Sequence, residues 1–162
     1  MRAVVVTFGF LALATLGTGC ARREKTTHTT SAAVLGLAEK KAFLERFVTF
    51  RRHYEALDYK IDFDDETTLA PGPSTTACDV RIYAKIPSEE AFQWIDGLEA
   101  DPVAPTAERL AWTKDVPSAP SSTEGYAWYR DKPGPAKGEE GKMVGLSKDR
   151  SEVLYRLVCT RN

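Results

Sequence analysis

Residues 78–86 read CDVRIYAKI and carry the clearest structural signal in this 162-residue chain. Every second residue from Cys78 is apolar, and most of the residues between are polar. That period-2 pattern is typical of a strand with one buried face. Residues 153–159 (VLYRLVC) alternate in the same way, with Cys159 on the apolar side. The two segments predict neighbouring strands of a sheet that rests on a hydrophobic core.

The same two strands predict how the cysteines pair. Cys78 starts one strand and Cys159 ends the other, and both side chains point toward the core. Antiparallel neighbours would bring these two ends together, so we expect a disulfide between them. Closing so long a loop would contribute about 4 kcal/mol on the chain-entropy model. The alternative is a pair of buried free thiols.

The rest of the chain predicts one α+β domain. We expect an antiparallel sheet of about five strands, with one long N-terminal helix and a second, shorter helix packed on one face. The long helix is expected from about residue 32 to 57, because aromatic and apolar side chains recur there every three or four residues: Phe43, Phe47, Phe50, Tyr54 and Leu57. Residues 88–97 predict the second helix. Strands are also expected at 58–63, 125–130, 142–147 and 152–160.

The N-terminus has the composition of an export signal. After a positively charged start, residues 3–16 are almost entirely apolar, and small residues follow. Residues 16–20 (LGTGC) resemble the lipobox of bacterial lipoproteins, although Gly17 stands where the strict pattern has Leu. The resemblance implies a lipoprotein signal peptide over residues 1–19 and a lipid on Cys20. A transmembrane helix and an ordinary signal peptide are the alternatives.

A lipid on Cys20 would anchor the mature chain in the bacterial envelope, facing the periplasm. Residues 20–31 contain no core-forming run and are expected to be a flexible tether, which leaves 32–162 as the single domain. In enteric lipoproteins an Asp after the lipidated Cys signals inner-membrane retention. Ala21 stands there, so we expect the outer membrane. The formal net charge of −1 argues against a nucleic-acid partner.

The sequence offers little for catalysis or cofactor binding. Neither His28 nor His53 has a cysteine or a second histidine at metal-ligand spacing, so no metal or other cofactor is expected. The chain has no Gly-x-Ser-x-Gly elbow, P-loop or dinucleotide motif, and we assign no catalytic residue. One acidic cluster could bind calcium, supply hydrolase carboxylates or be a solvated strand end: Asp62, Asp64, Asp65 and Glu66.

The outward faces of the two cysteine-containing strands favour a binding role. They combine arginine and tyrosine with modest apolar side chains, as protein interfaces do. We therefore expect a protein partner to be bound by Arg81, Tyr83, Lys85 and Arg156 on these strands, with Trp128 and Tyr129 extending the surface. The alternative is that a helix or loop covers part of this surface. Small, lipid-anchored, disulfide-tied domains resemble immunity proteins, which implies a toxin or effector as partner. The alternatives are a structural or accessory lipoprotein of an envelope or secretion assembly and, less favoured, an envelope hydrolase.

Overall fold

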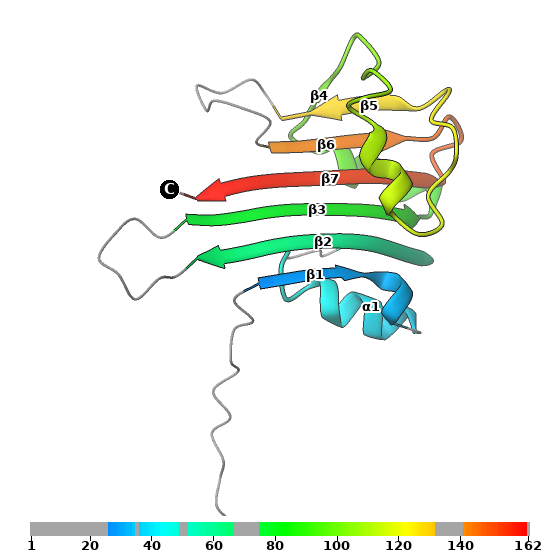
Figure 1. The fold of residues 1–162 in the computed structure, drawn as a ribbon. Helices are drawn as coiled ribbons and strands as arrows, with labels where there is room; N and C mark the ends of the chain where they lie inside the picture. The colour runs from blue at the N-terminus through cyan, green and yellow to red at the C-terminus, as the bar shows by residue number, and fades with distance from the viewer. Residues whose placement is uncertain (1–25, 35, 49–51, 67–74, 132–140, 162) are drawn as a thin grey trace, which may run out of the picture.

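One antiparallel sheet of seven strands forms the protein in the computed structural model (Figure 1). The structure describes residues 26–34, 36–48, 52–66, 75–131 and 141–161. The strand order is β1-β2-β3-β7-β6-β5-β4, and the strands are β1 Thr26–Thr30, β2 Ala56–Glu66, β3 Thr75–Lys85, β4 Glu99–Ala100, β5 Ala127–Arg130, β6 Gly141–Leu146 and β7 Glu152–Arg161. The helical elements are short: α1 Leu37–Leu44, α2 Phe92–Ile95, and the 3₁₀ turns η1 Ser31–Ala33, η2 Ser88–Glu90 and η3 Ala111–Asp115.

The predicted fold class is therefore wrong: the described chain is mostly β, with seven strands in place of five. The helix expected over residues 32–57 is confined to α1, and β2 already begins at Ala56. β2 pairs with β3 over eleven residue pairs, from Ala56↔Lys85 to Glu66↔Thr75. Tertiary pairing of that length overrides a helical spacing of aromatic residues, because helix propensity is a weak local preference. Phe50, which the predicted helix included, lies outside the described residues.

The inner strands were predicted and the outer ones were not. β2, β3, β5, β6 and β7 cover the segments where the sequence indicates strands. β1 consists of residues 26–30 (TTHTT), which the sequence suggested as part of a tether, and it pairs along β2. Its β-branched threonines suit a strand, but they show no alternation between apolar and polar. The second predicted helix is also shorter, because residues 88–97 form η2 and then the four-residue α2.

Side chains are buried on both faces of the sheet. On one face, α1 and α2 cover the larger core, where Leu44 and Trp94 pack over strand residues such as Tyr59 and Ile82. On the other, η3 and its flanks cover a smaller core, with Trp112 among its buried side chains. Figure 1 shows the η3 segment, in yellow-green, crossing the front of β7 and its neighbours. Polar side chains occupy the rest of this front face.

The central strands β3 and β7 hold the cysteine pair. Cys78 and Cys159 are directly opposite each other, with Cα atoms 5.0 Å apart and sulfur atoms at bonding distance. The pairing predicted from antiparallel neighbours is confirmed. It joins residues 81 apart in sequence across the middle of the sheet.

Candidate functional site

The six side chains predicted to bind a partner do not share one exposed surface. Tyr83 and Trp128 are each 4% exposed and pack in the smaller core beneath η3. Tyr129 follows Trp128 in β5, so it points to the opposite face and packs against the larger core. Lys85 is exposed at the end of β3. The strand register thus separates the residues that the sequence suggested as one patch.

The other two predicted residues, Arg81 and Arg156, are neighbours on adjacent strands and share one carboxylate. Nη2 of Arg81 donates to Asp79 at 2.7 Å, and Nε and Nη2 of Arg156 donate to Asp79 at 3.0 and 2.8 Å. Arg81 also lies 2.9 Å from Asp115 and 3.3 Å from Asp62. Burial would raise the pKa of Asp79, but the hydrogen bonds from the two arginines outweigh it and hold the pKa below its usual range.

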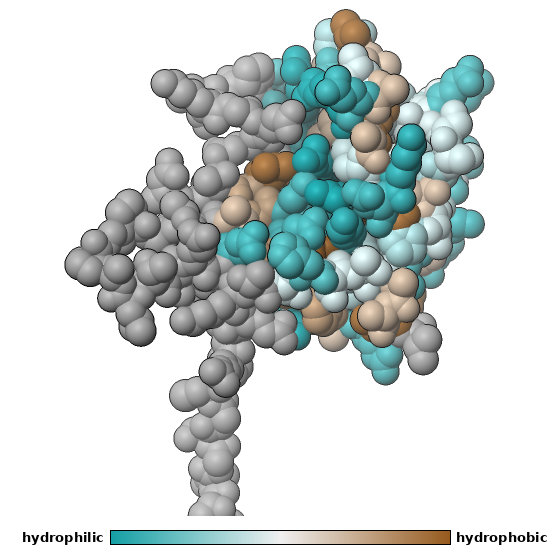
Figure 2. Space-filling model, viewed as in Figure 1, coloured by the Kyte–Doolittle hydropathy of each residue, from teal (hydrophilic) through white to brown (hydrophobic). Residues whose placement is uncertain are grey.

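These five residues form what we call the sheet-face network: Asp62, Asp79, Arg81, Asp115 and Arg156. The network lies on the face of the sheet that η3 partly covers, and Figure 2 shows a hydrophilic region at the centre of the front face. Its positive and negative groups are already paired with each other, and both arginine side chains are less than a quarter exposed. The network therefore stabilises the sheet and offers a partner little unpaired charge.

The described carboxylates of the acidic cluster on β2 also contact neighbouring side chains. Asp62 accepts from Nδ1 of His28 at 2.9 Å, and Asp64 lies 3.8 Å from Nε2 of the same ring. The side chains of Asp65 and Glu66 lie outside the described residues. Within the described part of the chain, no three His, Cys, Asp or Glu side chains gather as metal ligands would. Asp62 thus contacts both His28 and Arg81, and Asp64 lies beside the His28 ring.

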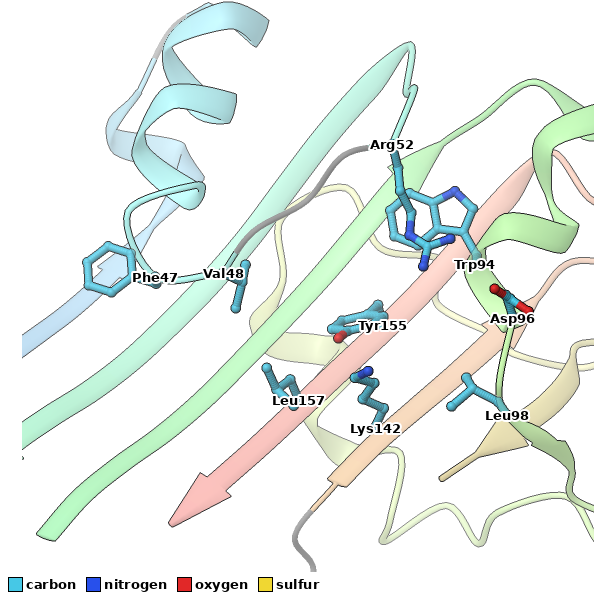
Figure 3. Close-up of a pocket in the computed structure, with 9 residues that line it drawn as sticks. All are labelled: Phe47, Val48, Arg52, Trp94, Asp96, Leu98, Lys142, Tyr155 and Leu157. Atoms are coloured by element: carbon cyan, nitrogen blue, oxygen red, sulfur yellow. The ribbon is translucent and has the colours of Figure 1, made fainter. Parts of the chain in front are cut away.

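A cleft of about 340 Å³ opens on the opposite face of the sheet (Figure 3). It lies between the end of α1, α2 with the residues after it, and strands β6 and β7. A space of that size takes one bulky side chain or a small ligand. Its lining residues are Phe47, Val48, Arg52, Trp94, Asp96, Leu98, Lys142, Tyr155 and Leu157.

Two buried aromatic side chains form the floor of this cleft. Trp94 and Tyr155 are 2% and 7% exposed, and their rings meet edge to face with centroids 6.3 Å apart. Burial, and next the negative charge of Asp131, raise the pKa of Tyr155 to about 12, although Arg52 opposes them. The Tyr155 hydroxyl therefore stays protonated at neutral pH. It gives the floor a neutral polar group instead of a charge.

Two cations stand on either side of Tyr155 in Figure 3: Arg52 and Lys142. The guanidinium carbon of Arg52 lies 5.4 Å from the ring centroid of Trp94, a cation–π arrangement. Burial lowers the pKa of Arg52, while Tyr155 and Asp96 act to raise it. Lys142 projects from β6 with an exposed side chain. With Asp96 as the one acidic lining residue, the lining has a formal charge of about +1.

Sequence reasoning missed this cleft because its parts come from distant segments. Arg52 lies within the helix that was predicted over residues 32–57, and neither Arg52 nor Trp94 was singled out as a site residue. One signal was available in β6, where Lys142 shares a face with the buried Val144 and Leu146. A lysine on an otherwise apolar strand face indicates that this face is open to solvent at that point.

Comparison of the chain with protein-family models, with curated proteins and with solved structures finds no match. In the stretches that the structure describes, no helix has the length and apolar character that crossing a membrane requires. The residues of the lipobox-like motif, including Cys20, lie outside the described residues.

Proposed function

We propose that this protein is a lipid-anchored envelope protein that acts by binding a protein partner on its periplasmic side. We further propose that the partner is an antibacterial toxin, so that the protein serves immunity. The observation that carries the binding role is the cleft over Tyr155. Tryptophan, tyrosine and arginine are the residue types that dominate binding hot spots, and Trp94, Tyr155 and Arg52 bring all three together there.

Two features of the chain support the location. The lipobox-like residues 16–20 favour a lipid on Cys20, and the Cys78–Cys159 pair suits an oxidising compartment. Since β1 starts at Thr26, six residues after Cys20, the lipid and the sheet can be at most about 20 Å apart. A partner would therefore be captured close to the bilayer. Ala21 after the lipidated Cys favours the outer membrane.

The anchor is tested by replacing Cys20 with alanine. The Cys20→Ala chain should accumulate as an unprocessed precursor that takes up no labelled fatty acid, because the acylated sulfur is missing. Mass spectrometry of the wild-type N-terminus should show a diacylglyceryl-cysteine. A processed Cys20→Ala product that stays membrane-bound would contradict the anchor.

The partner is tested by protection of cells. The full chain is co-expressed with periplasm-directed candidate toxins encoded beside its gene, and survival is compared with Arg52→Glu and Lys148→Glu variants. Both substitutions change the charge equally, but Lys148 lies in the β6–β7 turn, away from the lining of the cleft. We expect Arg52→Glu alone to abolish protection. If the wild-type chain protects no better than an empty vector, the immunity role is wrong. If Arg52→Glu protects fully, the cleft is not the binding surface.

A further inference from the structure

We infer that the cleft recognises a carboxylate attached to an apolar group, and that the partner presents it as its C-terminal residue. This inference rests on the proposed function, because it names what the bound partner offers to the cleft. The two cations, the net charge and the size and polarity of the lining support this assignment.

The cations of the cleft form no close ion pair with a described carboxylate, although Asp96 lies near enough to Arg52 to act on its pKa. Neither the guanidinium of Arg52 nor Nζ of Lys142 has a carboxylate within ion-pair distance among the described residues. On the other face, by contrast, Arg81 and Arg156 both bind Asp79. A partly buried guanidinium carries five N–H donors in a planar fork that matches the two oxygens of a carboxylate. Among the described residues, the guanidinium of Arg52 therefore has N–H donors available for an anion.

The net charge around the cleft is too small to favour a doubly charged ligand. Arg52 and Lys142 contribute two positive charges, and Asp96 removes one. The nearby carboxylate of Asp131 accepts a hydrogen bond from the Lys142 backbone N–H at 2.7 Å and adds further negative potential. A phosphate monoester with nearly two charges would meet that potential, whereas a carboxylate carries only one.

The remaining lining residues favour an apolar group beside the carboxylate of the ligand. Val48, Leu98 and Leu157 line the cleft together with the Trp94 ring. About 340 Å³ suffices for one large side chain and its terminal carboxylate, but not for a folded surface. The interior of a chain carries no backbone carboxylate. A C-terminal aromatic or large aliphatic residue satisfies all of these requirements together.

The test uses two synthetic peptides with the sequence GSGSGF, one ending in a free carboxylate and the other in an amide. The detergent-purified full chain is titrated with each by calorimetry and tryptophan fluorescence, since Trp94 lies in the cleft. We expect the free acid to bind at least about tenfold more tightly than the amide, because charge-assisted hydrogen bonds are roughly twice as strong as neutral ones.

Substitutions in the cleft test whether its cations cause the preference for the free acid over the amide. Arg52→Gln and Lys142→Met should each reduce the preference for the acid to about twofold or less, whereas Lys142→Arg should keep it. Lys148→Met, which removes an equal charge outside the cleft, should bind both peptides like the wild type. Because Lys142 is exposed, its variants test binding without a folding defect.

The outcomes separate this inference from the proposed function. If acid and amide bind equally, or neither binds, while the chain still protects cells against the toxin, the carboxylate inference is overturned and partner binding stands. N-acetylphenylalanine distinguishes the sources of the carboxylate. If it binds and the GSGSGF acid does not, the ligand is a small free acid and the chain-terminus assignment is wrong.

Discussion

Asp79 accepts hydrogen bonds from Arg81 and Arg156, and this arrangement links the stability of the sheet to pH. Its pKa lies below the ordinary value of 3.8 in the folded state, so folding favours the ionised form. The contribution of Asp79 is therefore fully present above pH 4 and is lost as the pH falls through the folded pKa. We expect the free energy of unfolding to decline in that acid range.

Replacing Asp79 with asparagine tests this residue. Asp79→Asn should lower the free energy of unfolding at pH 7 by about 2 kcal/mol, because two partly buried arginines lose their anionic partner. It should also flatten the decline below pH 4. Urea unfolding between pH 2.5 and 7 measures both effects. Asp64→Asn is the matched control, since Asp64 is half-exposed and lies 3.8 Å from Nε2 of His28. Equal losses in the two variants would contradict the role of the sheet-face network.

At the scale of elements, β5 and β6 pack closely where a glycine lies opposite a tryptophan. Gly145 lies directly opposite Trp128, and a Cβ at Gly145 would stand 2.8 Å from two atoms of that ring. Gly145→Ala should therefore cost about 1–3 kcal/mol of stability, because Trp128 is buried and has little room to move. Thermal and urea unfolding would measure the loss.

A second substitution shows whether the ring is the cause. In a Trp128→Leu background, which is itself destabilised, the added cost of Gly145→Ala should be smaller by at least about 0.5 kcal/mol. The same cost in both backgrounds would mean that the glycine is required for another reason.

The pairing of β3 with β7 is reinforced by Cys78 and Cys159. Replacing both with alanine removes a link between residues 81 apart and should lower the free energy of unfolding by about 4 kcal/mol on the chain-entropy model. The wild-type protein in excess dithiothreitol should unfold at a similar urea concentration to the double variant. Two free thiols in the oxidised wild type, detected by alkylation and mass spectrometry, would refute the pair.

At the scale of the whole molecule, the sequence predicts the strands in which apolar and polar residues alternate. It does not predict the edge strands or the cleft. β3 and β7 alternate clearly, so their adjacency and the cysteine pair follow from the pattern. β1 shows no such alternation, and its pairing with β2 comes from tertiary context. The helical spacing from Phe43 to Leu57 misled the helix prediction, because Tyr54 and Leu57 enter the same core from extended chain.

The cleft could not be predicted, for a related reason. Arg52, Trp94 and Tyr155 come from three separate segments, and only the packing of α1 and α2 on the sheet brings them together. In the described structure, the helices cover one end of this face and leave Lys142 uncovered. No local pattern encodes that gap, since it depends on how far each helix extends.

Ser31 lies just before the predicted start of the domain at residue 32, and it is bonded to strand β2. Its side chain is fully buried, and Oγ donates to Asp58 Oδ1 at 2.7 Å and accepts from the Tyr59 N–H at 3.0 Å. A chain that begins at Ala32 therefore loses both β1 and these two hydrogen bonds. We expect it to be less stable than a chain that begins at Thr26 by at least about 2 kcal/mol.

Urea unfolding of the two truncated chains, followed by tryptophan fluorescence, measures this difference. Ser31→Ala in the longer chain should reproduce part of the loss, because it removes the hydroxyl and keeps the strand. Identical unfolding midpoints would mean that residues 26–31 act as a tether and contribute nothing to the fold. A clear difference would mean that the folded domain includes the first strand, which begins six residues after the proposed lipid on Cys20. The anchor and the edge of the sheet would then be held together at the membrane surface, and the orientation of the cleft would be restricted by the short connection.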